Sequence, residues 1–454
     1  MIPAFKKFYA DIYQENLAEL GNHLLLFQAY FLEEELSWVE QHELNKRIDA
    51  YVDALSVGEN VAIDFSNRML YEGDEDEMLG AIYFLLSCPE TPENTIFAVL
   101  ESFASGENIA LFSLAFKHAR CPSLGQYLVP FLTHENPDIR AATVEVLGYR
   151  GEADPRRIWP LFHDKAEAVK LAAMNAVTRL GFKDACPAME LAVLDKKDIF
   201  NEHSVFPLLM LGSDKALQFS RLACRSAHHV KSQYPMYLAL AGNEEDLDNI
   251  LKVLVFGDLN LAVLEALGIF GALEGVNTLM KFLSSSEEDE RLMAARSLNQ
   301  ISGAQLYDEL AVAENEEEEL SPAHVIGNAG IKTEKKAEDF QAEQQLVKIK
   351  RDCTNKDIWT AWWLENKACF DVSLRYRHGK PYSFFLLLQE IAHPETKHED
   401  RQRAYNELVI RSGHYIAFEP DWFVDRQIAA LKEWQTWWKQ NKHTLSNQWM
   451  FHGK

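Results

Sequence analysis

Histidine next to glutamate is the residue pair in this chain that is best suited to hold a metal ion. The pair occurs at His42-Glu43, His134-Glu135 and His398-Glu399. Imidazole nitrogens and carboxylate oxygens are common ligands of iron and zinc, and a metal held in this way activates oxygen or water. A shared site needs such pairs at equivalent points of neighbouring structural units. Because these pairs fall in separate regions of the chain, the sequence does not predict a metal site.

Other sequence motifs for catalysis are missing. His228 and His229 are adjacent, and on a helix their rings would point about 100° apart, which is unsuited to sharing a metal. The chain has no glycine-rich phosphate loop, no G-x-S-x-G nucleophile turn and no H-E-x-x-H zinc motif. We therefore predict a protein that is not an enzyme, with no catalytic residues, no cofactor and no metal ion.

A regular series of glycines, here called the glycine ladder, indicates the helices that would position any functional site. Each glycine follows a mostly apolar, helix-like stretch such as NAVTRLG. The glycines recur with a period of about 30 residues, and self-similarity at such a period is typical of stacked helical units. Glycine also suits a helix C-terminus that needs a left-handed backbone. The sequence therefore predicts an all-α fold, an α-solenoid of short helical hairpin repeats with helical regions at both ends. The ladder consists of Gly151, Gly181, Gly212, Gly242, Gly271 and Gly303, with Cys88 and Cys121 at the same repeat position upstream.

Two repeats, ending at Gly151 and Gly181, align with each other position by position. Each unit is expected to contain a helix, a polar turn and a second helix. Arg140 and Lys170 align near the start of the second helix, where we expect the basic side chain to bind carbonyl groups or the acidic turn of the next unit. In later units, Pro207 and Pro235 are expected to shorten or kink the second helices.

Changes of composition divide the chain into four predicted parts. Residues 1–75 read as an N-terminal region of long amphipathic helices, and residues 76–304 contain the repeats. Residues 305–350 are charged, with the acidic run Glu316–Glu319, and are predicted to be an acidic linker. Residues 351–454 are predicted to form a tryptophan-rich helical region.

The charge is unevenly distributed. The whole chain has a net charge of −24, whereas residues 351–454 have 15 basic and 13 acidic residues. The repeats are therefore strongly acidic, which argues against nucleic-acid binding and suits a basic protein partner. Solubility alone also explains an acidic surface. The sequence shows no secretion leader and no membrane span, and its six cysteines form no C-x-x-C pair, so we expect no membrane insertion and a cytoplasmic location with reduced thiols.

The C-terminal region contains a rare motif twice, W-x-x-W-W-x-x-N, which ends once at Asn366 and again at Asn441. On a helix, the first two tryptophans share a face. One interpretation is that they form a core that caps a helical stack, with partners for the indole N–H groups. The other is a protein-binding surface, since tryptophan dominates interface hot spots. The binding candidates are Trp359, Trp362, Trp434 and Trp437.

A second set of candidate binding residues stands six positions before each glycine. If the second helices line a concave surface, these residues form a row along it. The alternative is that neighbouring helices partly bury this position. The row comprises Glu145, Asn175, Phe206, Met236 and Glu265, followed by Ser297.

The repeats resemble the short HEAT-like repeats of phycobilin lyases over residues 78–304. The order of parts resembles that of a bacterial family of unknown function that is often encoded near type VI secretion genes. The segments that carry this resemblance are HELNKRIDAYVDAL, IWTAWWLEN and NELVIRSG. This resemblance implies a non-enzymatic protein-binding scaffold, as an adaptor, chaperone or immunity protein. The expected partner is a secreted effector or a component of the secretion machine. The alternative is a metal-dependent hydroxylase or a lyase of the HEAT-repeat type, since the hydroxylases place His-Glu pairs in symmetric repeats.

Overall fold

The computed structural model describes residues 3–32, 37–194, 203–226, 229–313, 346–445 and 447–454. The chain divides into two compact units. Unit 1 contains residues 1–216 and 387–442 with Gly453, and unit 2 contains residues 217–386 and 443–452 with Lys454. This division differs from the boundaries expected at residues 75, 304 and 350, because the C-terminal region contributes to both units. The run Glu316–Glu319 and the residue His228 lie outside the described residues.

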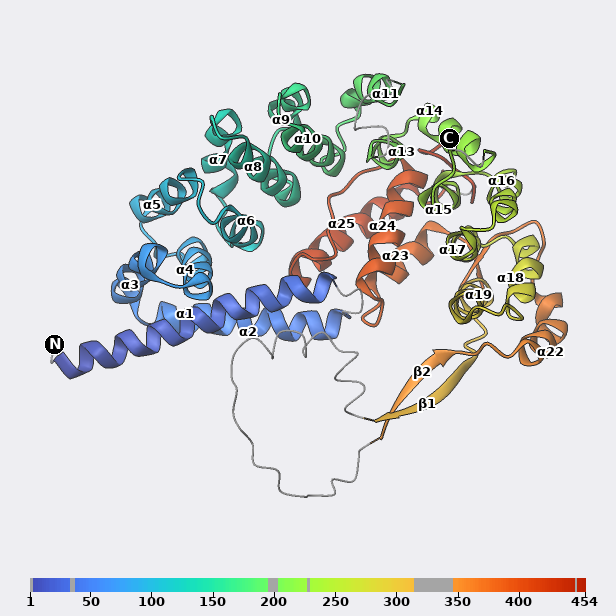
Figure 1. Ribbon diagram of the computed structural model, residues 1–454, viewed down its shortest axis with the longest axis horizontal. Helices are drawn as coiled ribbons and strands as arrows, with labels where there is room; N and C mark the ends of the chain where they lie inside the picture. Colours follow the sequence, from blue (N-terminus) through green and yellow to red (C-terminus); the bar gives the residue numbers. More distant parts are fainter. Residues whose placement is uncertain (1–2, 33–36, 195–202, 227–228, 314–345, 446) are drawn as a thin grey trace. The chain divides into compact units, whose positions relative to one another are not determined.

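Unit 1 is a row of helical hairpins with an inner and an outer layer (Figure 1). The long helix α1 packs mainly on α4, and α2 packs on α1. The N-terminal helices are α1 (Pro3–Leu32), α2 (Trp38–Ser56), α3 (Glu59–Glu72) and α4 (Glu75–Ser87). The hairpins that follow comprise α5 (Glu93–Ala104), α6 (Ile109–His118), α7 (Leu124–Leu128), α8 (Pro137–Arg150), α9 (Pro155–Ile158), α10 (Glu167–Arg179), α11 (Cys186–Leu194) and α13 (Val205–Leu211). The C-terminal part adds α24 (His398–Ser412), α25 (Val424–Asn441) and most of α23 (Phe384–Ala392).

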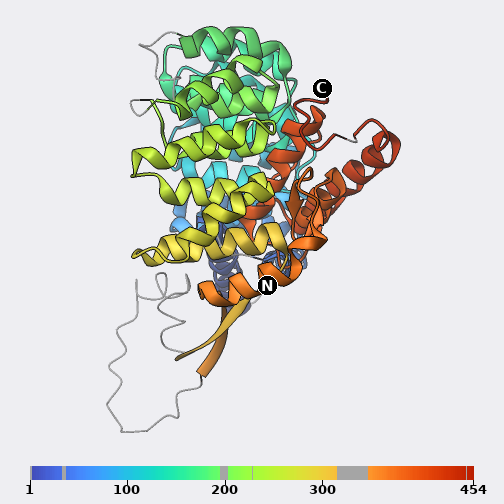
Figure 2. The same cartoon turned by 90° about the vertical axis from the view of Figure 1, so that its right-hand side faces the viewer.

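Unit 2 continues the hairpin pattern, and Figure 2 shows its yellow-green helices stacked side by side. Its inner helices pack in sequence, α15 on α17 and α17 on α19. The helices are most of α14 (Asp214–Cys224), then α15 (Gln233–Ala241), α16 (Asp246–Lys252), α17 (Asn260–Phe270), α18 (Val276–Phe282), α19 (Glu288–Ser302) and α22 (Lys356–Asn366). The strands β3 (Tyr376–Arg377) and β4 (Lys380–Pro381) form a small ribbon. The all-α solenoid predicted from the sequence is confirmed.

The glycine ladder ends the inner helices as expected, with one exception. Gly151, Gly181, Gly212, Gly271 and Gly303 have φ between 62° and 89°, the left-handed conformation that glycine adopts without strain. Gly242 instead has φ −71° and ψ 172°. The exception follows from its neighbour Asp246, whose carboxylate accepts the Asn243 N–H at 2.9 Å and turns the chain into the next helix.

Prolines shape the helices in two ways. Pro130 and Pro160 lie in short 3-10 segments, Val129–Thr133 and Trp159–His163, that complete the outer helices of two repeats. Proline cannot donate the helical hydrogen bond, which favours this tighter geometry. Pro207 and Pro235 stand at the third positions of α13 and α15, which have 7 and 9 residues. The predicted shortening of these inner helices is therefore confirmed.

Arginine side chains tie the units of the stack together. Arg140 donates to the carbonyl oxygens of His134 and Glu135 at 2.7 and 2.9 Å. It also forms a bidentate ion pair with Asp164, in the turn of the next repeat, at 2.8 and 3.0 Å. Arg291 donates in the same way to two turn carbonyls, those of Ser285 and Ser286, at 2.8 Å. The expected role of this basic position is thus confirmed for Arg140, and Arg291 makes the same kind of carbonyl bonds in a later unit.

In each unit an extended C-terminal segment packs against the ladder glycines. In unit 1, a Cβ built on Gly181 would lie 2.6 Å from the Tyr415 ring. In unit 2, a Cβ on Gly271 would lie 2.3 Å from the Tyr376 carbonyl oxygen, and the Tyr376 N–H donates to the Gly271 carbonyl at 2.7 Å. The absence of a side chain therefore permits close backbone approach as well as the left-handed turn.

The region expected to be a linker begins and ends in β structure. Strand β1 (Tyr307–Ala313) pairs antiparallel with β2 (Leu346–Asp352), in the register Tyr307 to Asp352. The Asn299 side chain anchors the base of this ribbon, donating to the Leu306 carbonyl at 3.0 Å and to Asp352 at 2.7 Å. The expectation of a linker over the whole of 305–350 is therefore wrong at its two ends. The alternation of apolar and charged residues within LVKIKRD is typical of a strand, and pairing with β1 satisfies its backbone groups.

Two further expectations concern membrane insertion and the state of the cysteines. Among the described residues, no helix is both long and apolar enough to cross a lipid bilayer. All six cysteines are described and none forms a disulfide.

Candidate functional site

The row of residues six positions before each glycine is not uniformly exposed. Glu145 and Asn175 are exposed, whereas Phe206, Met236 and Glu265 are half-buried. Ser297 is buried, packs on Gly268 of the neighbouring helix and donates to the Leu264 carbonyl at 2.8 Å. The part of the row best placed for a partner therefore lies in unit 1.

The duplicated tryptophan motif builds one equivalent structure in each unit. Trp359 and Trp434 are 1% and 0% exposed, and their indole N–H groups donate to the carbonyls of Cys353 and Ile416. The second tryptophans, Trp362 and Trp437, are half-buried and meet the first edge-on. The motif asparagines end α22 and α25, and each donates to the carbonyl of its second tryptophan at 2.8 Å. Trp359 and Trp434 are thus core residues that cannot contact a partner.

The His-Glu dipeptides do not converge. Glu43 pairs with Lys46 at 2.7 Å, and Glu399 pairs with Arg403. His134 Nδ1 accepts the Asn136 N–H at 3.1 Å. Within the described part of the chain, no three His, Cys, Asp or Glu side chains gather in a way that could hold a metal ion.

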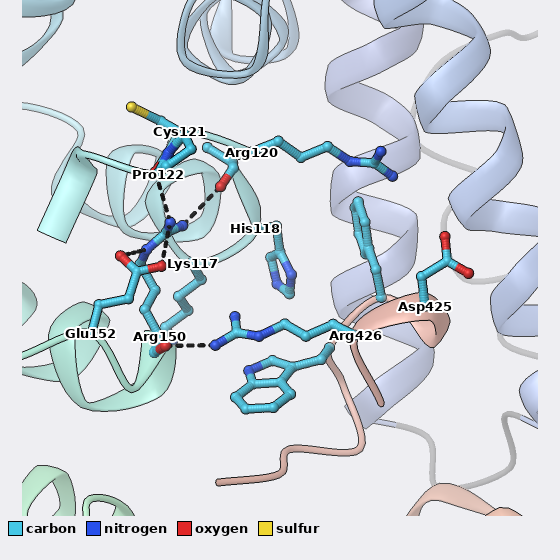
Figure 3. A pocket seen from close by; sticks show the side chains of 12 residues that line it. Lys117, His118, Arg120, Cys121, Pro122, Arg150, Glu152, Asp425 and Arg426 are labelled. Carbon is cyan, nitrogen blue, oxygen red and sulfur yellow. Dashed lines mark hydrogen bonds and ion pairs between the residues drawn. The ribbon is translucent and has the colours of Figure 1, made fainter. Parts of the chain in front are cut away.

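Unit 1 contains a cleft of about 410 Å³ that sequence reasoning missed. It lies between the ends of α6 and α8 and the start of α25 (Figure 3). Its residues come from segments about 300 positions apart in the chain, so no local motif could have indicated it. We call it the basic cleft because four cationic side chains line it, Lys117, Arg120, Arg150 and Arg426, against two carboxylates, Glu152 and Asp425. His118 and Trp422 also line it.

Arg150, the last residue of α8, forms one wall of the basic cleft. Its guanidinium donates to the carbonyls of Phe116 and Ala119 at 2.8 Å and of Cys121 at 3.0 Å. It also pairs with Glu152 at 2.8 Å. These bonds satisfy carbonyl groups at the end of α6 that have no helical partner, so Arg150 is a structural cation.

Arg426 lies across the cleft from α6 and has a different environment. Its guanidinium stacks on the Trp422 ring, 3.5 Å from the ring centroid, and donates to the Arg150 carbonyl at 2.5 Å (Figure 3). Burial lowers the pKa of Arg426. In the described chain, Arg426 forms no ion pair with a carboxylate, whereas Lys117 pairs with Glu145 and Arg120 pairs with Asp49. It is therefore the cation of the cleft best placed to receive an anionic group.

His118 lies between aromatic rings at the base of the cleft. It stacks on Phe423 with ring centroids 5.6 Å apart and meets Phe27 and Tyr149 edge-on. Burial, reinforced by nearby Lys117, lowers the pKa of His118 to about 3. The imidazole is therefore neutral at physiological pH and is a weak proton acceptor.

A second hollow, of about 350 Å³, adjoins the first at Arg120. Its walls come from α2 and α4, with Arg120 from the end of α6. Asp49, Asp53 and Ser56 lie on one face of α2, because their spacing of four and three residues matches the helical turn. The acidic hollow is lined by Asp49, Asp53, Ser56, Tyr83, Ser87 and Arg120.

Two half-buried carboxylates, Glu419 and Asp421, lie in the segment that leads into α25. Glu419 pairs with Arg179 at 3.0 Å. Burial, together with the nearby charge of Asp421, raises the pKa of Glu419 to about 7 despite the Arg179 guanidinium. Burial likewise raises the pKa of Asp421. With a pKa of about 7, the Glu419 carboxyl can exchange a proton near neutral pH.

Comparison of the chain with protein-family models and with curated proteins gave no match. The function therefore has to be argued from the site itself.

Proposed function

We propose that the protein is a non-enzymatic protein-binding scaffold that takes a segment of its partner into the basic cleft of unit 1. The observation that carries this proposal is Arg426, which lines the cleft, is stacked on the buried Trp422 ring and forms no ion pair with a described carboxylate. Arginine is among the residue types that contribute most to the binding energy of protein interfaces. Trp422 is itself buried and holds the Arg426 guanidinium in place. Glu145 and Asn175, exposed on α8 and α10, extend the surface along the inner helices.

The resemblance to the family encoded near type VI secretion genes suggests which partner to test. We infer a role as adaptor, chaperone or immunity protein for a secreted effector or a component of the injection machine. An immunity protein binds one effector and blocks its toxicity, whereas an adaptor binds both the effector and the machine. Rescue of cells that express the neighbouring toxin separates these roles.

The test is co-purification with the products of the neighbouring genes, expressed one at a time. We expect one of them to form a stable complex at micromolar concentration. Arg426→Ala should weaken the complex at least tenfold, in line with the loss of an interface hot spot. The matched control is Arg157→Ala, because Arg157 is exposed on the outer helix α9. If Arg426→Ala left the affinity of the complex unchanged, the interface would have to lie outside the basic cleft. If no neighbouring gene product formed a complex, the scaffold proposal would be overturned.

An enzyme, a hydroxylase or a lyase, is the second candidate, and Glu419 is the feature that favours it. A carboxyl with a pKa of about 7 has the value expected of a general acid or base at neutral pH. The purified protein would then turn over a substrate in a manner lost in Glu419→Gln. Stoichiometric iron in the purified protein would favour the hydroxylase version.

A further inference from the structure

Charge pairing in the basic cleft leaves one cation without a counter-ion in contact. Lys117, Arg120 and Arg150 each pair with a carboxylate, at 2.6, 2.7 and 2.8 Å. Arg426 donates to the Arg150 carbonyl but pairs with no carboxylate in the described part of the chain. Asp425 also lines the cleft, but in Figure 3 its carboxylate points away from Arg426. The cleft can therefore accept one negative charge beside Arg426.

The environment of His118 is a second sign of positive charge in the basic cleft. Burial, and after it the charges of Lys117, Arg426 and Arg150, lower the pKa of this imidazole to about 3. Three cations thus act in the same sense at the base of the cleft. Burial also lowers the pKa of Arg426, and the nearby carboxylates do not restore it. An anion in contact with Arg426 would offset both effects.

The Arg426 guanidinium is held in position by contacts within the chain. It stacks on the buried Trp422 ring, 3.5 Å from the ring centroid, and donates to the Arg150 carbonyl at 2.5 Å. A guanidinium has five N–H donors, and Arg426 is half-buried in the wall of the cleft, so donors remain for an incoming anion. Little side-chain freedom is lost when such a preorganised cation binds.

The size, charge and lining of the cleft indicate which anion fits. Its volume of about 410 Å³ lies at the small end of the range for ligand sites. A phosphate group carries about two negative charges, whereas one cation is unpaired here and the whole chain has a net charge of −24. An isolated carboxylate matches this balance better. Exposed Pro122 and half-buried Phe423 also line the cleft and offer apolar contact.

We propose that Arg426 binds the C-terminal carboxylate of the partner chain, with an apolar last side chain against Pro122 and Phe423. A chain terminus carries its carboxylate and its last side chain on the same Cα atom, and only one stretch of chain has to leave the cleft. An acidic residue within a segment uses its side chain for the charge, and the chain has to enter and leave a small cleft. The inference rests on the proposed scaffold function and names the chemistry by which the partner is held.

The experiment is calorimetric titration of the full-length protein with an acetylated hexapeptide of glycine and serine that ends in leucine with a free carboxylate. The same peptide with an amidated terminus removes only the charge. We expect the free-acid peptide to bind and the amidated peptide to bind at least tenfold more weakly, since hydrogen bonds between charged groups are the strong ones. Equal binding of the two peptides, or no binding of the free-acid peptide at about 1 mM, would overturn the proposal.

Three further probes test the source of the anion and the apolar contact. Glycine in place of the terminal leucine should lower the affinity about threefold to tenfold, and an equal affinity would overturn the placement of the last side chain. An amidated hexapeptide with an internal aspartate offers the carboxylate as a side chain, and inorganic phosphate offers a free anion. Binding of either as tight as that of the free-acid peptide would overturn the assignment to a chain terminus.

A variant locates the binding in the cleft. Arg426→Gln removes the charge and keeps an amide N–H donor for the Arg150 carbonyl. It should lower the affinity for the free-acid peptide at least tenfold and leave the melting temperature close to that of the wild type. The matched control is Arg157→Gln on α9, an exposed cation outside the cleft. An equal loss in the control would show a general attraction of the peptide and would overturn the site.

The outcome is separable from that of the proposed function. Binding of the free-acid peptide with the expected variant pattern, in a protein that forms no complex with its gene neighbours' products, would sustain the carboxylate site and remove the scaffold role in secretion. A stable complex that is weakened by Arg426→Ala, in a protein that binds the free-acid and amidated peptides equally, would sustain the scaffold and remove the carboxylate site.

Discussion

Tyr149 and Trp422 are joined across 273 residues of sequence, because the Trp422 indole N–H donates to the Tyr149 carbonyl oxygen at 3.2 Å. The Tyr149 hydroxyl donates in turn to the Asp421 carbonyl at 3.2 Å. These bonds fix the segment before α25 to the end of α8 and hold Trp422 where Arg426 stacks on it. The basic cleft therefore depends on them.

Deleting the Tyr149 hydroxyl tests this attachment. Tyr149→Phe leaves the buried Asp421 carbonyl without a donor, and we expect the free energy of unfolding to fall by about 1–2 kcal/mol. Urea denaturation measures the change. Tyr71→Phe is the control, because Tyr71 is 65% exposed, and it should change the stability by less than about 0.5 kcal/mol. Equal effects of the two variants would contradict the attachment.

Two glycines of unit 2 separate backbone strain from close packing. Gly257 and Gly271 have φ of 82° and 74°, but a Cβ on Gly257 meets nothing within 4 Å. Gly257→Ala should therefore cost about 1 kcal/mol, from the left-handed backbone alone. Gly271→Ala adds a clash with the Tyr376 carbonyl and should cost about 1–3 kcal/mol more. Chemical denaturation of both variants checks the difference, and equal costs would mean that the Tyr376 segment moves away freely.

Tryptophan substitutions distinguish core from surface. Trp359→Ala removes a side chain that is 1% exposed, and we expect a loss of about 3–5 kcal/mol in stability. Trp362→Ala, at the half-buried second position of the motif, should cost less than half as much. Thermal unfolding of the two variants gives the comparison. If Trp362→Ala were the more destabilising change, the core assignment of the motif would be reversed.

Stability should depend on pH through Glu419. Its pKa is raised from 4.5 to about 7 in the folded protein, so between these values the folded state binds more protons than the unfolded state. The contribution of this group is therefore present below pH 4.5 and is lost as the pH rises through 7. As the pH rises from 5 to 8, the free energy of unfolding of Glu419→Gln should fall by less than that of the wild type. Urea denaturation at the two pH values measures the difference. Glu433→Gln, at an exposed site of α25, should follow the wild type, and a parallel shift of Glu419→Gln at both pH values would contradict the assignment.

The repeat architecture was predictable because its determinants are local. Glycine is favoured wherever a helix ends in a left-handed backbone conformation, as at Gly151. Glycines therefore recur in the sequence with the period of the repeats. The arginine position was predictable for the same reason, since Arg140 bonds a turn six residues before it and an acidic residue in the next repeat.

The clefts were not predictable, because their residues are distant in the chain. Arg120 carries no motif and meets Asp49 of α2 from 71 residues away in the chain. Asp425 carries none either, and it lines the cleft only because residues 387–442 join unit 1. The tryptophan motif was recognisable in the sequence as a duplication. The difference in burial between Trp434 and the half-buried Trp437 was not predictable, because it depends on the segment that covers the first ring. The ribbon of β1 and β2 was missed because its strands are separated by more than thirty residues.

The composition of unit 1 from two separated stretches bears on how the protein is made. Residues 217–386 are synthesised between the two parts of unit 1. During translation, the part of unit 1 that ends at Ala216 leaves the ribosome without α24 and α25, so the inner ends of α8 and α10 remain uncovered until residues 387–442 have also been synthesised. Long sequence separation of contacting parts slows folding. A nascent chain stalled just before Leu387 would therefore display the glycine ends of its repeats to chaperones, and release of the last helices would complete the unit.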